Sequence, residues 1–126
     1  MKFYWLALIS IFTMIFFSVS CKKEESPKAI VKVVNAQNYG IKDALVIVFA
    51  GDSVNSEFYI DPKLNKKIDS AFTNASGEAE FEFANESVLQ VLATKQIGSS
   101  MYSGEAVLYL KKDKIEEKII VLTNEN

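Results

Sequence analysis

The sequence lacks histidine and arginine altogether, and it contains one cysteine and two prolines among its 126 residues. Without histidine, the chain has neither the commonest general base nor the commonest metal ligand. Without arginine, it has no planar guanidinium with which to bind a phosphate or a carboxylate bidentately. A single cysteine excludes a disulfide within the chain. We therefore expect a protein that is not an enzyme and that holds no metal ion and no cofactor.

Positive charge is not in excess, because 14 lysines stand against 16 acidic residues and the formal net charge is −2. Binding of nucleic acid needs a clustered positive surface, so we expect no nucleic-acid partner. Apolar side chains are abundant, with 49% of residues hydrophobic and 24% charged. This balance is typical of a folded chain, and the length suits one domain.

The amino-terminal residues are apolar and almost uncharged. Lys2 is the single charged residue before Cys21, and Phe3–Val19 forms an apolar run. A basic start, an apolar core and small residues at the cleavage point are typical of a secretory signal. We therefore predict a cleaved signal peptide at residues 1–20. Two alternatives stay open: an uncleaved segment at the lower limit of a bilayer-spanning helix, and an incidental thiol at Cys21.

The residues around Cys21 resemble the processing site of a bacterial lipoprotein. Ser18, Val19 and Ser20 occupy its lipobox positions, with Ser18 in place of the usual leucine. The resemblance implies lipidation of the Cys21 sulfur, cleavage before it, and acylation of the new amine with a fatty acid such as palmitate. It also implies a membrane partner through the lipid anchor. Lys22 resembles the sorting residue of outer-membrane lipoproteins, so the expected location is the cell envelope, on the periplasmic or the surface-exposed face of the outer membrane.

Beyond the signal, the chain divides into a short tether and one domain. Residues 21–27 are polar after Cys21 and end in Pro27. The six residues after the cysteine span at most about 20 Å. We predict that residues 28–123 form a single domain that this tether holds close to its membrane.

Apolar residues in the domain recur with a period of two rather than 3.6. In Glu78–Phe83, three glutamates alternate with one alanine and two phenylalanines, which is typical of a half-buried strand. Six further short segments are rich in Val, Ile, Leu and aromatic residues, and turn residues bound them. They are Ala29–Val34, Ala44–Phe49, Ile68–Thr73, Val88–Thr94, Glu105–Leu110 and Ile115–Leu122. The sequence therefore predicts an all-β fold, a seven-stranded antiparallel β-sandwich that follows the amino-terminal signal helix.

Two details of this pattern are less distinct. Ser99–Gly104 is polar and is predicted as a break between strands. Lys112–Ile120 fits either a strand or a short helix, because Ile115 and Ile119 are four residues apart.

Two stretches resemble a known family. Val31–Asn35 with Tyr39–Val48 is similar to the opening of carboxypeptidase-regulatory-like domains, also called prealbumin-like or transthyretin-like. Thr73–Phe81 resembles the Thr-Asp-x-x-Gly-x-x-x-Phe hairpin of that family, with Asn74 in place of aspartate. The resemblance implies a transthyretin-like sandwich that serves as a binding or accessory module. Enzymes of related folds depend on histidine, so their activities are not implied here.

Gly51–Lys67 is the longest stretch between predicted strands, and connections of this length are often functional. Its middle contains Phe58, Tyr59 and Ile60, which we take as candidate ligand-binding residues at the surface. The preceding strand is apolar on both faces, so Leu45, Ile47 and Phe49 need a cover on the outer side. Either the connection folds back over them, or a partner or second subunit docks there.

Three hypotheses about function follow. The first is a non-catalytic cell-envelope lipoprotein, anchored through Cys21, whose sandwich binds another envelope protein or a glycan. The second is a structural or assembly subunit that acts by β-strand addition at an exposed edge. The third is a carboxylate-dependent envelope hydrolase, although Glu78, Glu80 and Glu82 alternate with core residues and are explained by a solvated face.

Overall fold

In the computed structural model of the chain, residues 23–125 are described. The predicted signal peptide and Cys21 lie outside the described residues. The described part contains eight strands and one short 3-10 helix, η1. They are β1 (Lys28–Val34), β2 (Leu45–Phe49), η1 (Pro62–Leu64), β3 (Ile68–Phe72), β4 (Glu78–Glu82), β5 (Ser87–Ile97), β6 (Ser100–Leu110), β7 (Ile115–Val121) and β8 (Thr123–Asn124).

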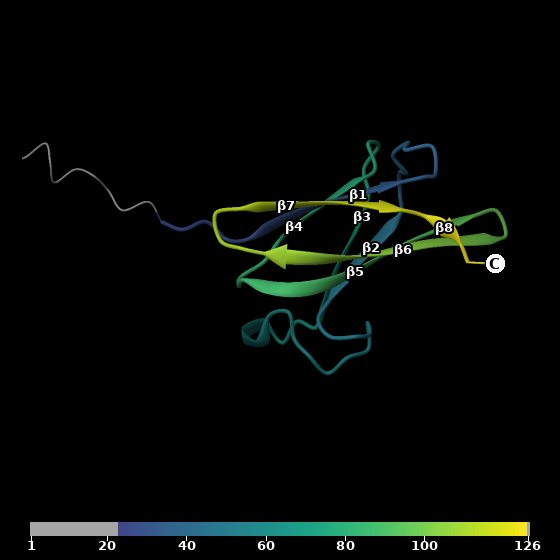
Figure 1. Cartoon of the computed structure of the whole chain (residues 1–126). Helices are drawn as coiled ribbons and strands as arrows, with labels where there is room; N and C mark the ends of the chain where they lie inside the picture. Colours follow the sequence, from purple (N-terminus) through teal and green to yellow (C-terminus); the bar gives the residue numbers. More distant parts are fainter. Residues whose placement is uncertain (1–22, 126) are drawn as a thin grey trace, which may run out of the picture.

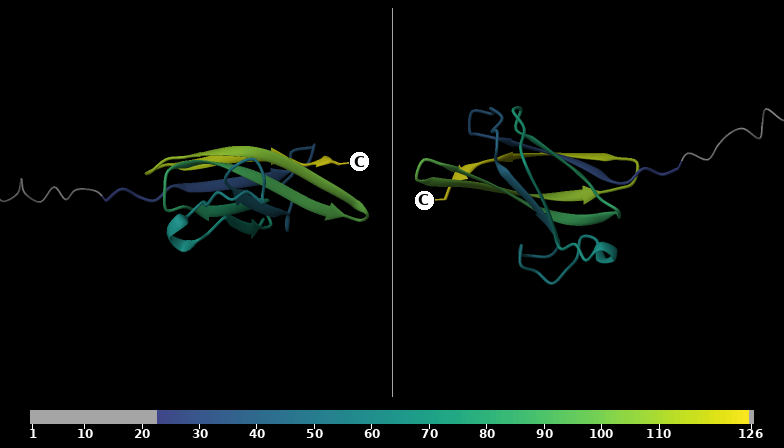
Figure 2. Two further views of the ribbon diagram at one scale, coloured as in Figure 1. Left: turned by 90° about the horizontal axis from the view of Figure 1, so that it is seen from below. Right: turned by 180° about the vertical axis from the view of Figure 1, so that it is seen from behind.

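The strands form two sheets that lie face to face, as Figures 1 and 2 show. The three-stranded sheet has the order β4-β1-β7, and the five-stranded sheet has the order β3-β2-β5-β6-β8. The prediction of an all-β sandwich is confirmed. All seven predicted strands are present within residues 23–125 as β1–β7, and β8 adds a two-residue eighth, so the predicted number was one too low.

The sheet order corrects the prediction of a purely antiparallel fold, because β1 and β7 pair in parallel. Both strands begin at the same end of the sandwich. Lys28 pairs with Ile115, and its backbone N–H donates to the carbonyl oxygen of Lys114 at 3.3 Å. The chain leaves β6 at this end and turns back as β7, while β1 enters from the tether at the same place. Two neighbours that enter from one end must run in the same direction.

The predicted break at Ser99–Gly104 was wrong, because β6 already begins at Ser100. The ladder continues to the pair Ile97 and Ser100, so the turn between them is short. Gly98 has a φ of +63°, the left-handed conformation that such a turn requires. Exposed positions near the tip of the hairpin accept polar residues without ending the strand. The segment Lys112–Ile120 contains the start of β7 and no helix.

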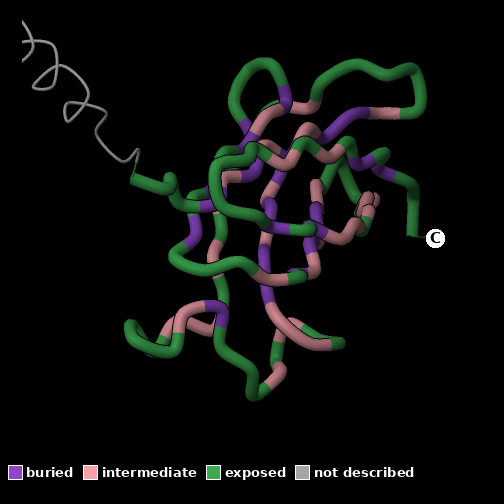
Figure 3. The backbone as a smooth tube through the Cα atoms, turned by 60° about the vertical axis from the view of Figure 1, so that its left-hand side comes forward, coloured by how far each residue is buried: buried purple, intermediate pink, exposed green. Residues whose placement is uncertain are grey.

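The core lies between the two sheets and is made mainly by alternate residues of β1, β2, β4, β5, β6 and β7, and Figure 3 shows the buried residues. In β1 the inward residues are Ala29, Val31 and Val33, and each is 1% exposed or less. Burial of a Val or Leu side chain contributes about 1.5–3 kcal/mol, so this layer supplies most of the stability of the fold. Ala79, Phe81, Leu89, Val91, Leu108 and Ile120 belong to the same cluster.

The topology gives the sandwich two distinct ends. β1 begins at one end, β2 and β4 finish there, and β6 passes there into β7. We call it the tether end, because Lys23–Pro27 joins β1 at this point. The Gly51–Lys67 connection follows the end of β2 and projects below the five-stranded sheet in Figure 1, and its residues Ile60, Asp61 and Leu64 line a hollow together with Ser26 of the tether. The β1–β2 connection with Tyr39, the tip of the β5–β6 hairpin and residues 122–125 lie at the opposite, far end (Figure 1).

The tether is attached to the sandwich by backbone hydrogen bonds. Glu25 donates its N–H to the Asp113 carboxylate at 2.5 Å, and the N–H of Asp113 donates to the carbonyl oxygen of Glu25 at 3.0 Å. The Pro27 carbonyl oxygen accepts the N–H of Phe83 at 2.9 Å. Residues 25–27 are therefore held against the tether end. None of the helices formed by residues 23–125 has the length and hydropathy needed to cross a bilayer.

Candidate functional site

The outer side of the five-stranded sheet is unusually apolar. In β2, Val46 and Val48 point into the core, so Leu45 and Ile47 point outward. The same alternation turns residues of β3, β5 and β6 to this side, apolar ones together with polar ones such as Ser70, Gln90 and Glu105. The apolar residues nearest to β2 form one group. We call the set the outer apolar face: Leu45, Ile47, Ile68, Phe72, Leu92 and Val107.

Strand register joins four members of the outer apolar face in two direct pairs. Leu45 pairs with Phe72 on β3, and Ile47 pairs with Leu92 on β5. Directly opposed side chains have Cβ atoms about 5 Å apart, so these pairs touch or nearly touch. Phe72 is 66% exposed and Ile68 is 41% exposed. A contiguous apolar surface of this kind is a feature of interaction sites.

The outward residues of β2 differ in exposure along the strand. Phe49, the last residue of β2, is only 8% exposed although it is not part of the core cluster. Leu45 and Ile47 lie farther from the connection and are only partly buried. Phe49 is therefore covered within the chain, whereas Leu45 and Ile47 are only partly covered, and docking of a partner there stays a prediction.

The three candidate residues in the middle of the connection differ in exposure. Phe58 is 65% exposed and Tyr59 is 44% exposed, whereas Ile60 is 8% exposed and joins the core cluster. The interpretation of Ile60 as a surface residue was wrong. Its backbone N–H donates to the Lys66 carbonyl oxygen at 2.9 Å, which closes the connection at its base and turns the side chain inward.

Local hydrogen bonds give the connection a defined shape. The Asp61 carboxylate accepts the N–H groups of Lys63 and Leu64 at 3.1 and 3.4 Å, and so caps η1. The ammonium of Lys67 lies 3.2 Å from the Glu57 carboxylate and 5.3 Å from the centre of the Tyr59 ring. Phe58 and Tyr59 are therefore presented to solvent on an organised segment.

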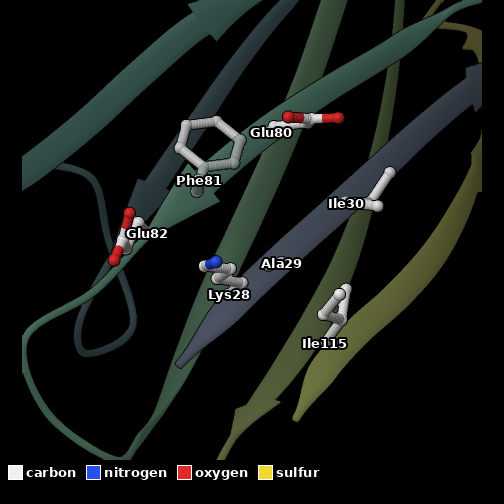
Figure 4. A pocket seen from close by; sticks show the side chains of 7 residues that line it. All are labelled: Lys28, Ala29, Ile30, Glu80, Phe81, Glu82 and Ile115. Carbon is white, nitrogen blue, oxygen red and sulfur yellow. The ribbon is translucent and has the colours of Figure 1, made fainter. Parts of the chain in front are cut away.

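A shallow hollow of about 490 Å³ lies over β1 and β4, and Figure 4 shows its lining. Glu80 and Glu82 project from β4 beside it, Lys28 stands opposite Glu82, and Ile30 stands opposite Glu80. Both carboxylates are exposed. The pairs Lys28–Glu82 and Lys32–Glu78 place opposite charges across β1 and β4, which is the arrangement of a solvated sheet face. No cluster of three or more acidic or cysteine side chains suited to a metal ion occurs within residues 23–125.

The β3, β5 and β6 members of the outer apolar face were not predicted from the sequence. Ile68 and Phe72 alternate with Ala71, which packs against the core, so the period-two pattern already marked them as outward. What the pattern could not supply is the order of the strands, which places Leu92 beside Ile47.

No family model matches the chain, and no curated protein matches its sequence. Among solved structures, 3-chlorocatechol 1,2-dioxygenase from Rhodococcus opacus 1CP is 14% identical with a TM-score of 0.48; the match covers 82% of this chain and 62% of the dioxygenase. This chain thus spans less than two thirds of that enzyme. A proposed carbohydrate-binding protein from Pseudomonas aeruginosa is 9% identical with a TM-score of 0.45, and the match covers 83% of this chain and 93% of that protein. At these values neither likeness assigns a family or an activity to this chain.

Proposed function

We propose that this chain is a non-catalytic lipoprotein of the cell envelope, anchored through Cys21, whose sandwich binds a second envelope protein through the outer apolar face. The main support is the exposure of Phe72 and Ile68 beside Leu45, Ile47 and Leu92. The core between the sheets does not need these outward residues to be apolar. A binding or accessory module of transthyretin-like topology, which the sequence resemblance implies, agrees with this proposal.

The anchor is supported by the sequence before the described domain. An apolar run ends at Cys21, the single cysteine, and a short charged tether follows. Several acyl chains on one residue anchor a protein stably, whereas a single chain binds only marginally. Lipid on Cys21 keeps the outer apolar face within a few tens of ångströms of other proteins in the same membrane.

Replacing Cys21 by alanine tests the anchor. We expect the Cys21→Ala protein to leave the membrane fraction, because it loses the sulfur that receives the lipid. Flotation of membranes, followed by intact-mass measurement of the floated protein, checks this. A wild-type mass without lipid, or a Cys21→Ala protein that stays fully membrane-bound, contradicts the proposal and supports an uncleaved spanning segment.

Photo-crosslinking tests the partner. A photoreactive phenylalanine analogue at Phe72 should give one discrete adduct in native membranes, and the same analogue at the exposed Tyr39 of the far end should give none. In the protein that carries the analogue at position 72, the further substitution Leu92→Asn should lower the yield of the adduct about tenfold. A loss of this size is typical of a central interface residue. Ile119→Asn, on the outer side of the other sheet, is the matched control. Equal adduct yields at positions 72 and 39 would contradict specific binding through the outer apolar face.

A second candidate is β-strand addition, and the free side of β3 favours it. Within the described residues β3 pairs only with β2, so its other edge offers unpaired backbone groups. In this case main-chain hydrogen bonds dominate binding. Leu92→Asn, two strands away from that edge, should then leave the Phe72 adduct unchanged, which distinguishes the two modes.

A further inference from the structure

Three large apolar side chains are exposed on the Gly51–Lys67 connection and are not part of the outer apolar face. Leu64, in η1, is 73% exposed, and Phe58 and Tyr59 are exposed by 65% and 44%. The fold does not bury them, and Ile60 alone fixes the connection to the core. Their exposure is therefore available for a contact outside the molecule.

The position of the connection indicates the contact. A hollow of about 270 Å³ is lined both by Ser26 of the tether and by Ile60, Asp61 and Leu64 of the connection, so the two segments are neighbours. Ser26 is five residues after Cys21. Five residues extend to at most about 18 Å. A bilayer that holds the lipid of Cys21 is thus within reach of the connection.

The chemistry of the connection suits a membrane interface. Tyrosine and other aromatic rings prefer the headgroup region, and exposed leucine gains from apolar surroundings. The charges of Gly51–Lys67 cancel, because three acidic residues (Asp52, Glu57 and Asp61) stand against three lysines (Lys63, Lys66 and Lys67). Attraction to anionic lipid is therefore not the main force, and the contact depends on the apolar side chains.

We propose that Phe58, Tyr59 and Leu64 enter the headgroup region of the membrane that holds Cys21, so that the tether end of the sandwich rests on the bilayer. This inference rests on the lipid anchor of the proposed function. The far end, with Tyr39 and the tip of the β5–β6 hairpin, then points away from the membrane. The outer apolar face is presented sideways, to proteins in the same membrane.

Tryptophan fluorescence tests the contact in the processed, lipidated protein. Trp5 is the single tryptophan of the chain and lies in the signal peptide that processing removes, so each introduced tryptophan is a unique probe. The protein is reconstituted into phosphatidylcholine vesicles with brominated acyl chains. Leu64→Trp and Phe58→Trp should lose about half of their emission or more, since interfacial side chains reach about 5–10 Å into the boundary. Tyr39→Trp is the matched control at the far end and should be quenched little.

The outcomes separate the two proposals. Protein that floats with the vesicles while Leu64→Trp and Tyr39→Trp are quenched equally overturns the contact and leaves the anchor intact. Protein that does not float overturns both. Adding phosphatidylglycerol should leave the contrast unchanged, and a contrast that appears only with this anionic lipid overturns the apolar contact. Circular dichroism of each variant shows whether the sheets are retained, and Phe58→Trp, which keeps an aromatic ring, provides a second probe if Leu64→Trp fails to fold.

Discussion

Replacing Gly77 by alanine should lower the free energy of unfolding by about 3 kcal/mol or more, a large share of the 5–15 kcal/mol typical of a domain. Gly77 has a φ of +82° in the turn between β3 and β4. A non-glycine residue in this conformation costs about 1 kcal/mol on its own. An added Cβ would also lie 2.6 Å from the Val33 carbonyl oxygen and 2.8 Å from the Gly40 Cα. Both neighbours are backbone atoms, so the clash cannot be relieved by turning a side chain.

Gly98→Ala is the matched control for this prediction. Gly98 also has a positive φ, +63°, but no atom lies within 4 Å of an added Cβ. Gly98→Ala should therefore lower the free energy of unfolding only by the cost of placing alanine at a positive φ, about 1 kcal/mol. Urea unfolding followed by circular dichroism gives both values. Equal losses for Gly77→Ala and Gly98→Ala would contradict the close approach of the β3–β4 turn to β1.

The same turn explains why part of the fold was predictable. A sequence such as Asn74–Gly77 is typical of a turn in which glycine supplies the positive φ, and Gly77 is found in that conformation. The Asn74 carboxamide oxygen accepts the N–H groups of Ser76 and Glu78 at 2.9 and 3.0 Å, the local bonding that makes asparagine a turn residue. Turns and period-two strands depend on near neighbours, so their signal is local in the sequence.

Long-range pairing was not predictable in the same way. The Asn74–Gly77 turn resembles a hairpin in sequence, yet β3 and β4 belong to different sheets. The parallel pairing of β1 with β7 joins residues about 90 apart in the chain, and no local pattern encodes it. At a sandwich corner the chain changes sheets while keeping its alternation, so alternation alone does not reveal the partner of a strand.

In the candidate site, too, locally encoded features were predictable from the sequence and features that depend on packing were not. Exposure of Phe58 and Tyr59 and burial of Ile60 depend on how the connection closes, with the Lys66 carbonyl oxygen accepting the N–H of Ile60. An irregular segment has no period from which to tell inward from outward residues. For Leu45 and Ile47, alternation did indicate the outward direction. The missing information was which strands lie on either side of β2.

Replacing Thr73 by valine should lower the free energy of unfolding by about 2–3 kcal/mol, although the two side chains have nearly the same shape. Thr73 is 2% exposed. Its hydroxyl donates to the Ile41 carbonyl oxygen at 2.5 Å and accepts the N–H of Ala44 at 2.9 Å. These bonds join the end of β3 to the segment that leads into β2. Valine leaves the buried N–H of Ala44 and the partly buried carbonyl oxygen of Ile41 without these bonds, and an unsatisfied buried N–H is costly.

Two controls isolate the hydroxyl of Thr73. Thr73→Ser keeps both hydrogen bonds and loses one methyl group, so it should cost only about 1 kcal/mol. Thr123→Val removes an exposed hydroxyl that lies 3.4 Å from the Ser103 carbonyl oxygen, and its effect should stay within about 0.5 kcal/mol. Urea midpoints of the three variants, measured at one pH, give the comparison. A Thr73→Val protein as stable as Thr73→Ser would show that the two bonds contribute nothing, and that the conformation of the β2 entry depends on the Ala44 side chain in the core instead.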